Sequence, residues 1–307
     1  MTCPSVAVLL ATYNGAAHCE TQLISLLWQR GVDVHIYVRD DVSRDATPAI
    51  LRDWAERHPG RFTIIDNEGV STGSANGNFF ALLAAIDTAR HDYVAFADQD
   101  DVWTPDKLAR AVKRLAEEGA EGYSSDLIAY SAAAEPAAAH AWILHKAGRP
   151  ADLDYLFQGA SAGCTYVLTR HAAAMAQAVM ATAPAFCADP SHDWILYAIC
   201  RSRGLKWVRD PAAEILYRQH GGNQYGAKRG PAELVAKLRV MRSSWYRDHI
   251  LWLRHVLINR DDERAVLDAV ARGALSDRWR LIREAGRFRR TPAYVAQLRA
   301  AIALRMI

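Results

Sequence analysis

The sequence predicts an α/β protein in which helices flank a mostly parallel β-sheet and a helical C-terminal extension follows. Apolar runs of strand length alternate with segments of helical spacing, about every 20 to 30 residues. From about residue 231 onward, only the helical spacing remains. The 307 residues, 51% hydrophobic and 23% charged, suffice for one large α/β domain and an appendage.

The first part of the chain is expected to alternate strand and helix four times. SVAVLLAT is a continuous apolar run, VDVHIYVRDD alternates, and RFTIIDN and DYVAFADQDD are further short apolar segments. A Ser/Asp cap signal opens the second helix, and Pro105 lies in the first turn of the fourth. We therefore predict strands at 5–13, 32–41, 61–67 and 92–101, and helices at 16–30, 43–60, 74–90 and 104–119.

The second part of the chain is less regular. The Ala-rich stretch AYSAAAEPAAAHAWIL is expected to be a strand edge running into a loop, and GASAGCTYVLTRHAAAM a turn, a short strand and a helix start. HDWILYAICRSRG predicts a helix, and KWVRDPAAEILYRQHGGNQYG a strand with a Gly-rich end. No internal repeat and no long linker occur, so we divide the chain into a catalytic domain at 1–226 and a basic helical extension at 227–307.

Composition excludes several classes of protein. No run of about 18 uncharged apolar residues occurs, so a transmembrane helix is not expected. The N-terminus has no basic n-region and is expected to be the first strand, not a signal peptide. The five cysteines contain no CxxC pair, which favours reduced thiols in a cytoplasmic protein over a disulfide frame or a zinc knuckle.

The net charge of +3 hides an asymmetry between the body and the tail. Residues 1–227 carry 19 Lys+Arg against 26 Asp+Glu, a balance of −7, and residues 228–307 carry 18 against 8, a balance of +10. A basic tail attracts nucleic acid, anionic lipid headgroups or phosphate-bearing substrates. The alternative is a well-solvated helical surface, and the sequence does not separate the two.

Polar side chains gather at three predicted strand ends. These ends present Thr12-Tyr13-Asn14, Asp40-Asp41 and the acidic stretch 98–101. In parallel sheets, ligands bind outside the carboxyl ends of the strands. Two carboxylates one residue apart can share Mg²⁺ or Mn²⁺, which take oxygen ligands and substrate phosphates. The simpler alternative is that these acids only cap the following turn and helix.

A series of motifs in fixed order adds a family resemblance. ATYNG, RDDVSRDAT, NEGVSTGSANGNF, FADQDDVWTPDKL, GASAGCTYVLTR, HDWIL and LYRQHGGNQYG follow one another between about residues 4 and 226. The series resembles the inverting family 2 glycosyltransferases of GT-A fold, and within them the bacterial rhamnosyltransferase-like group. FADQDDVWTPDKL and YRQHGGNQYG are the most specific pieces.

The resemblance implies a site for a nucleotide-sugar donor. It assigns the base and ribose to Thr12, Tyr13, Asn14 and Asp41, with Asp40 beside Asp41. A carboxylate can accept the N3–H of uracil or thymine, so Asp41 suits a pyrimidine nucleotide. The alternative for residues 40–43 is a plain turn and helix cap. Val42 stands where the family usually has Gly, and valine disfavours a positive φ.

The resemblance also implies a DXD motif that binds a metal ion. It assigns Asp100 as the direct ligand of Mg²⁺ or Mn²⁺ and Asp98 to the sugar or ribose. Downstream, it suggests His220 as a third metal ligand or diphosphate contact and Arg218 as a phosphate contact; the alternative for the histidine is a structural hydrogen bond. Asp101, Trp103 and Lys107 are expected to be a helix cap, a packing anchor and a surface or ion-pair residue.

Inverting transfer needs a general base for the acceptor hydroxyl. The resemblance assigns this role to Asp193 in HDWIL, where the following apolar helix would partly desolvate the carboxylate. The alternative is that Asp193 is only the acidic N-terminal charge of that helix. Gly163-Cys164 is expected to line the acceptor side, with no nucleophilic role for Cys164 because no paired histidine is evident.

These expectations combine into one functional hypothesis. The protein would move a sugar, with rhamnose suggested by the subgroup, from a dTDP- or UDP-sugar to a hydroxyl of a bacterial surface glycan or lipid-linked acceptor. It would be cytoplasmic, with a possible peripheral contact of its basic tail at the inner face of the plasma membrane. The alternatives are a metal-dependent nucleotidyltransferase, which would want a basic phosphate loop after the first strand, and a nucleic-acid-binding protein acting through the tail. We expect no nucleic-acid partner, since the tail shows no recognised fold signature.

Overall fold

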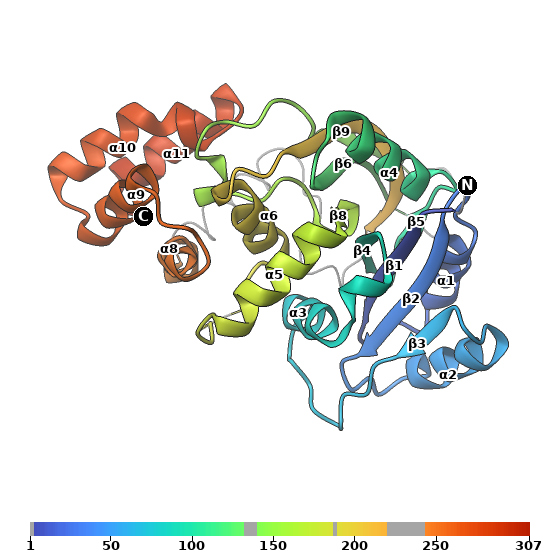
Figure 1. The fold of residues 1–307 in the computed structure, drawn as a ribbon. Coiled ribbons are helices and arrows are strands. Elements are labelled where there is room, and N and C mark those ends of the chain that lie inside the picture. The colour runs from blue at the N-terminus through green and yellow to red at the C-terminus, as the bar shows by residue number, and fades with distance from the viewer. Residues whose placement is uncertain (1–2, 132–139, 187–188, 220–242) are drawn as a thin grey trace.

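The computed structural model describes residues 3–131, 140–186, 189–219 and 243–307. In these residues the strands form one sheet in the order β3-β2-β1-β4-β8-β6-β9-β5, and β7 pairs with β6 (Figure 1). Their bounds are β1 (Ser5–Thr12), β2 (Asp33–Asp40), β3 (Phe62–Ile64), β4 (Tyr93–Asp98), β5 (Val102–Trp103), β6 (Gly122–Ser131), β7 (His140–Leu144), β8 (Val167–Thr169) and β9 (Trp207–Gln219).

The sheet changes character half-way across. Strands β3, β2, β1 and β4 are parallel, whereas β8 lies antiparallel between β4 and β6, and β6 and β9 are again parallel to each other. The four strands predicted in the first part are confirmed. The Ala-rich stretch was only partly anticipated: β6 begins at Gly122, ahead of the alanines, where polar Ser124 and Ser125 obscure the strand pattern.

Helices cover both faces of the sheet (Figure 1). Several begin or end inside the predicted ranges because polar residues at the boundaries form turns and caps; Ser74, for example, accepts a hydrogen bond from the Gly77 N–H. The bounds are α1 (Cys19–Leu27), α2 (Thr47–Arg57), α3 (Ala75–Ala85), α4 (Lys107–Glu118), α5 (Arg170–Thr182), α6 (His192–Ser202), α8 (Ser244–Trp252), α9 (Asp261–Arg272), α10 (Leu275–Phe288) and α11 (Pro292–Ala303).

The strands are buried on both faces, as a sheet between two helical layers requires. Along β1, alternate side chains enter different cores: Val8 packs with α1, α2 and α4, and Leu9 with α3, α5 and α6. Both side chains are fully buried. The continuous apolar run therefore arises because neither face of this strand meets water.

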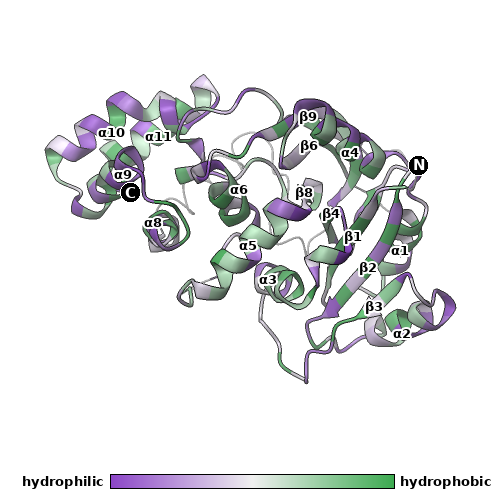
Figure 2. Cartoon of the chain, viewed as in Figure 1, coloured by the Kyte–Doolittle hydropathy of each residue, from purple (hydrophilic) through white to green (hydrophobic). Residues whose placement is uncertain are grey.

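The C-terminal helices lie at the opposite end of the molecule from β2 and β3 (Figure 1) and share the core of α6. The Tyr246 hydroxyl donates to the Phe157 carbonyl at 2.6 Å, and an Arg203 N–H donates to the Val256 carbonyl at 2.8 Å. Helices α10 and α11 mix hydrophobic and hydrophilic residues (Figure 2). The extension thus packs against the first part of the chain, and its separation as a domain at residue 226 stays a prediction.

Among the described residues, no helix has the length and apolar character needed to cross a bilayer. The described cysteines, Cys3, Cys19, Cys164 and Cys200, are all free thiols. Three of these four are buried, and Cys3 is exposed. Packing, not cross-linking, therefore holds together the part of the chain that the structure describes.

Candidate active site

The three predicted strand ends meet at one edge of the sheet. In the register, Thr12 pairs with Asp40, and Ala11 pairs with Asp98. The ends of β1, β2 and β4 therefore lie side by side, because parallel neighbours end at the same edge. The structure brings together the donor-binding stretch 12–14, Asp41 and the acidic residues that follow β4.

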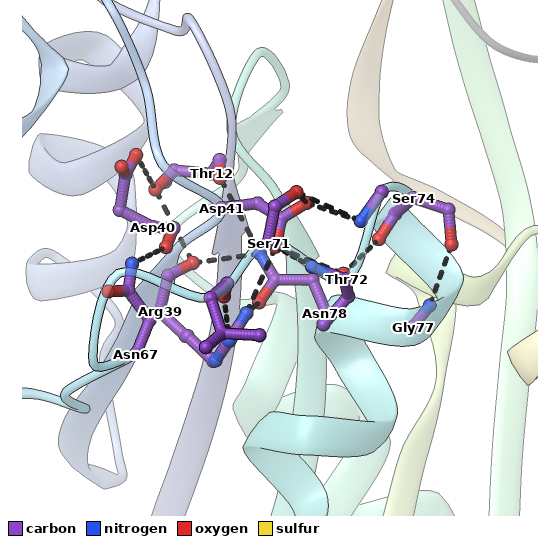
Figure 3. A network of polar contacts seen from close by, with 12 residues as sticks. Thr12, Arg39, Asp40, Asp41, Asn67, Ser71, Thr72, Ser74, Gly77 and Asn78 are labelled. Atoms are coloured by element: carbon purple, nitrogen blue, oxygen red, sulfur yellow. Dashed lines mark hydrogen bonds and ion pairs between the residues drawn. The ribbon is translucent and has the colours of Figure 1, made fainter.

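Asp41 is held inside a loop formed by residues 71–73 (Figure 3), which we call the Asp41 loop. Its carboxylate accepts hydrogen bonds from the Thr72 and Gly73 N–H groups at 2.6 and 3.0 Å and from the Ser71 hydroxyl at 2.9 Å. Arg39 adds a buried ion pair at 3.1 Å. Burial alone would raise the pKa of Asp41, but these hydrogen bonds outweigh it and hold the pKa below its usual range.

These hydrogen bonds give Asp41 a structural role in the loop. Both of its carboxylate oxygens already accept hydrogen bonds from the protein, so in this conformation Asp41 shapes the loop beside the donor site. The same arginine reaches further: Arg39 also donates to the Val70 carbonyl and to Asn78, each at 2.8 Å. A direct contact between Asp41 and a nucleotide base stays a prediction.

Asp40 closes the neighbouring turn. It accepts hydrogen bonds from the Thr12 hydroxyl at 3.0 Å and from the Ser43 N–H at 2.7 Å, so the turn alternative describes it well. Val42 lies between Asp40 and Ser43 in the sequence, with φ +64° and a 39% exposed side chain. The conformation that the usual glycine would favour is therefore kept, with the steric strain that valine brings to positive φ.

Tyr13 and Asn14 join the end of β1 to the other two strand ends. The Tyr13 N–H donates to the Gln99 side-chain carbonyl at 2.8 Å, and the Gln99 amide returns a bond to the Tyr13 carbonyl at 2.9 Å. A Cβ on Gly15 would lie 2.1 Å from Gln99 Oε1, so no other residue fits without movement. Asn14 binds the next turn through Ser43 and Arg44.

No function was assigned to Gln99 from the sequence, although this residue is part of the motif FADQDD. Its position between two aspartates, in a turn that must keep a fixed shape, could have indicated a structural role. The tyrosine ring of Tyr13 itself is 52% exposed beside this tie, which leaves it accessible to a planar ligand.

Residues 98–101, which we call the acidic turn, follow β4 directly. Burial, and next the Asp100 charge, raise the pKa of Asp98 to about 7. Burial, followed by Asp98 and Asp100, also raises the pKa of Asp101 well above its usual value. Asp101 Oδ2 is buried and has no hydrogen-bond partner among the described residues. The turn therefore combines two carboxyl groups of raised pKa with one buried oxygen that lacks a hydrogen-bond partner among the described residues.

Behind the acidic turn lies a buried lysine. Lys107 is 1% exposed, with its ammonium 3.5 Å from the centre of the Trp103 ring. Its surface location was predicted wrongly, because α4 turns this side chain inward beneath the turn. Asp101 is also no helix cap: Asp106 holds the N-cap position of α4, and Asp101 accepts from the Arg218 N–H at 3.3 Å. Trp103 is a packing anchor as expected, 2% exposed.

Arg218 lies where the motif placed it, on β9 beside the acidic turn. Besides the backbone bond to Asp101, its Nε donates to the Asp100 carbonyl at 3.1 Å, and its guanidinium lies 5.0 Å from the Tyr130 ring. His220 lies outside the described residues, so its assignment as a metal ligand or diphosphate contact stays a prediction.

Asp193 begins α6 on the other side of the site. It is half-buried and close enough for its charge to raise the pKa of Asp98, after the larger effects of burial and Asp100. Asp193 Oδ1 accepts from the Ser191 hydroxyl and, at 2.6 Å, from the Trp194 N–H. The carboxylate therefore lies in the first turn of α6, near enough to Asp98 for their charges to interact.

A lock between α3 and α6, which the sequence did not predict, fixes the position of Asp193. Asn76 Oδ1 accepts from the His192 backbone N–H at 3.1 Å and contacts its Nδ1 at 2.7 Å. An amide oxygen only accepts, so Nδ1 carries the proton of a neutral ring. The pKa of His192 is lowered by burial. Its Nε2 lies 2.1 Å from where a Gly163 Cβ would be, which explains the small residue there.

At the acidic turn, three side chains of the described residues lie close enough together to hold a metal ion. Asp98, Asp101 and Cys164 offer ligand atoms within 4.8 Å of one another. The thiol favours softer metals, and burial raises the pKa of Cys164 well above its usual value, which also removes it as a nucleophile. Asp98 and Asp100 are partly exposed, so these two carboxylates can face a metal–diphosphate while Asp101 and Cys164 form the rear wall.

Comparison with known proteins supports this interpretation of the fold and of the family. The family model described as glycosyl transferase family 2 matches residues 7–172, more than half of the chain. The dTDP-rhamnosyl transferase RfbG of Shigella flexneri is 33% identical over 249 residues, which cover 81% of this chain and 84% of that protein.

Solved structures agree on the fold. S. aureus TarS 1-349 in complex with UDP superposes with a TM-score of 0.58 at 14% identity, covering 99% of this chain and 86% of that one. The same protein in complex with UDP-GlcNAc gives a TM-score of 0.55 at 14% identity over 88% of this chain and 71% of that one. The GT-A-like fold expected from the motifs is thereby confirmed, and the chain belongs to glycosyl transferase family 2.

Proposed function

We propose that this glycosyltransferase is metal-dependent and transfers rhamnose, with inversion, from a pyrimidine nucleoside diphosphate to a hydroxyl of a bacterial surface glycan. One observation carries the proposal: the ends of β1, β2 and β4 converge on an acidic turn that lies close enough to Asp193 for its charge to act on Asp98. The 33% identity with a dTDP-rhamnosyl transferase over 81% of the chain favours dTDP-rhamnose as the donor.

The donor would lie over the ends of β1 and β2. Tyr13 and Asn14 would supply the exposed floor, with the ring of Tyr13 available to stack on the base and Thr12, 1% exposed, behind them. Asp41, held in its loop, would present that loop to the nucleotide. TarS, which matches this fold, is known in complex with UDP and UDP-GlcNAc, and this favours a nucleotide-sugar at the same edge.

The acidic turn would hold the cation and the diphosphate. Asp100, with Asp98 beside it, would hold Mg²⁺ or Mn²⁺, and Arg218 on β9 would contact a phosphate. When bound, the divalent ion supplies Lewis-acid stabilisation of the departing diphosphate. The tie between Gln99 and Tyr13 keeps the turn at a fixed distance from the end of β1, so both ends of the donor would meet a preformed surface.

Asp193 would act as the general base. Its Oδ1 accepts two hydrogen bonds from Ser191 and Trp194, which fix the carboxylate at the start of α6. A fixed base can take the proton of an acceptor hydroxyl as that oxygen attacks the anomeric carbon opposite the diphosphate. The bond that forms is oxygen to anomeric carbon, and the bond that breaks is anomeric carbon to phosphate oxygen.

The C-terminal helices would bring the enzyme to a lipid-linked acceptor at the inner face of the plasma membrane. Leu275 and Trp279 on α10 and Leu304 after α11 are 65%, 67% and 69% exposed. They belong to one end of the helix pair, because Arg278 Nε donates to the Ile302 carbonyl at 3.0 Å. A tryptophan and leucines within a region of charge +10 suit an anionic bilayer surface.

The central test is a thermal-shift panel of nucleotide-sugars with and without Mn²⁺, followed by transfer assays. We expect stabilisation by dTDP-rhamnose only when Mn²⁺ is present, and a product with the opposite anomeric configuration. The Asp193→Asn variant should bind dTDP-rhamnose as the parent does and lose transfer by about 100-fold or more. Unchanged turnover of Asp193→Asn would remove this residue as the base.

A separate experiment addresses the membrane contact. The full-length protein should co-sediment with vesicles rich in phosphatidylglycerol, and the Trp279→Ser variant should do so less. Trp28, 71% exposed at the end of α1, offers a matched control, and Trp28→Ser should sediment like the parent. Equal sedimentation of the parent and Trp279→Ser would remove the C-terminal patch as the contact.

A further inference from the structure

A cleft of about 830 Å³ opens near the edge of the sheet opposite the candidate active site. The end of α4, the segment 147–152 and the turn between α6 and β9 form its walls. Trp207 in its wall pairs with Gly122, which is joined through Leu168 to Val94. Val94 precedes Asp98 by four residues, which is about 13 Å along a strand. The cleft is therefore separate from the acidic turn.

The walls of the cleft carry an excess of positive charge. Two carboxylates line it, and both are already paired: Glu118 with Lys206 at 3.2 Å and with Arg114, and Asp152 with Arg287 at 2.6 Å, which is not in the wall. The cations in the wall are Arg114, Arg149, Arg201, Lys206, Arg209 and Arg260. Positive charge thus remains after every lining carboxylate has been used.

Arg209 shows the imbalance most clearly. Its guanidinium donates to the Gly148 and Ala160 carbonyls at 3.0 and 3.3 Å, and none of the described carboxylates lies within ion-pair distance of it. Burial, followed by the charge of Arg290, lowers the pKa of Arg209 to about 10. This half-buried guanidinium donates only to neutral carbonyls. It therefore lacks the anionic partner that a buried guanidinium normally has.

The layer behind the cleft cannot supply that partner. Asp154 is fully buried and already serves two cations, Arg290 at 2.5 Å and Arg201 at 3.3 Å. Arg149 is exposed at the rim of the cleft. Arg260 pairs with Asp262 and Glu263 at 3.6 and 3.5 Å, so Arg149 and Arg209 are the wall cations without a carboxylate partner among the described residues. An anion from outside would meet little competition for these two.

We propose that this cleft is a second binding site, for a phosphate-bearing anion of two or more charges. Arginine forks match phosphate oxygens in pairs, and Arg209 with Arg149 would supply the decisive contacts. The walls are preformed: the Trp207 indole N–H donates to the Ser124 hydroxyl at 3.0 Å, and the Arg201 side chain donates to the Ala151 carbonyl at 3.3 Å. The site would bind independently of the donor and without a divalent cation.

The test is calorimetric titration of the full-length protein with inorganic pyrophosphate, in EDTA and at constant ionic strength. The parent should bind, and Arg209→Gln and Arg149→Gln should each bind at least about tenfold more weakly, the loss of one charge-assisted contact. The matched control is Lys113→Gln on α4, whose exposed ammonium pairs with Glu117 outside the cleft. No binding by the parent, or equal binding by all variants, would overturn the proposal.

Two further arms identify the ligand. Glucuronate at the same concentration should bind less tightly than pyrophosphate, and equal or tighter binding of glucuronate would contradict a phosphate site. Phosphatidylglycerol vesicles distinguish a lipid headgroup from a free anion. If the ligand is a headgroup, the protein should bind the vesicles, pyrophosphate should displace it, and Arg149→Gln should weaken the vesicle binding. Because Arg149 is exposed, that variant keeps the test valid even if Arg209→Gln folds poorly.

Discussion

The Asp41 loop and the acidic turn lie at the same edge of the sheet, but they differ in how their carboxylates are hydrogen-bonded. Asp41 is ionised inside a complete set of hydrogen bonds and an ion pair with Arg39. The acidic turn keeps a buried Asp101 oxygen without a partner among the described residues, and the pKa of Asp98 rises to about 7. A satisfied carboxylate maintains the fold, whereas an unsatisfied one is poised for a ligand.

The largest expected effect follows from removing the satisfied acid. Asp41→Ala should lower the free energy of unfolding by about 3–5 kcal/mol, because it leaves Arg39 buried without its partner and frees the N–H groups of residues 72 and 73. Urea denaturation of the parent and variant measures the difference. The control is Asp33→Ala at the exposed start of β2, which should stay within about 0.5 kcal/mol.

The acidic turn should respond in activity, not in stability. Asp100→Asn is expected to reduce transfer on the order of 100- to 1,000-fold, the range for losing a group that stabilises charge in a transition state. Its free energy of unfolding should equal or exceed that of the parent, because one repelling charge leaves the turn. Turnover like that of the parent, or a loss of stability as large as that of Asp41→Ala, would erase the distinction between the two regions.

The next effect concerns the lock that places Asp193. Asn76→Ala removes the acceptor for both His192 donors, and a loosened base should lower kcat about tenfold or more while KM for the donor stays close to that of the parent. Steady-state kinetics separate the two constants. The Asn76→Gln variant keeps an accepting oxygen and the amide group that donates to Asp189, and should recover part of kcat, which a general loss of packing would not allow.

Much of this organisation could be predicted from the sequence. Polar residues directly after apolar runs gave the converging strand ends, because parallel strands place their carboxyl ends together. Asp98, Asp193 and Arg218 lie near the acidic turn in the structure, while their roles stay predictions. The fold class was equally accessible, since strands buried on both faces are continuous apolar runs.

What could not be predicted depends on distant contacts. Gln99 has no special appearance in the sequence, and its role comes from meeting Tyr13, 86 positions earlier. Asn76 meets His192 across 116 positions, and Lys107 turns inward because Trp103 and Asp101 lie beneath the helix start. Periodicity describes which face of an element is apolar, but it does not say which polar side chain will find a partner there.

The acidic turn should also give the stability a pH dependence. Because the folded pKa of Asp98 is raised from 3.8 to about 7, the folded state binds more protons between these values, so stability without metal should fall as the pH rises from about 4 to 7. The Asp98→Asn variant should show a flatter profile of thermal unfolding. The Mn²⁺-induced rise in Tm should be larger at pH 8 than at pH 6; a rise independent of pH would separate the metal from Asp98.

The smallest effect tests the backbone strain at Val42, next to Asp41. Val42 has a φ of +64°, which costs a residue with a side chain about 1–2 kcal/mol, and its exposed side chain loses little packing when removed. Glycine at this position costs about 0.4–1 kcal/mol of unfolded-state entropy, so Val42→Gly should gain up to about 1 kcal/mol, or about 2–4 °C in Tm. The matched control is Val70→Gly, just before the Asp41 loop, where no strained φ exists to be relieved and stability should fall by about the entropic cost. If both variants lose stability alike, the turn at Val42 is not strained. If Val42→Gly gains stability but loses affinity for the donor, the valine side chain itself contributes to donor binding.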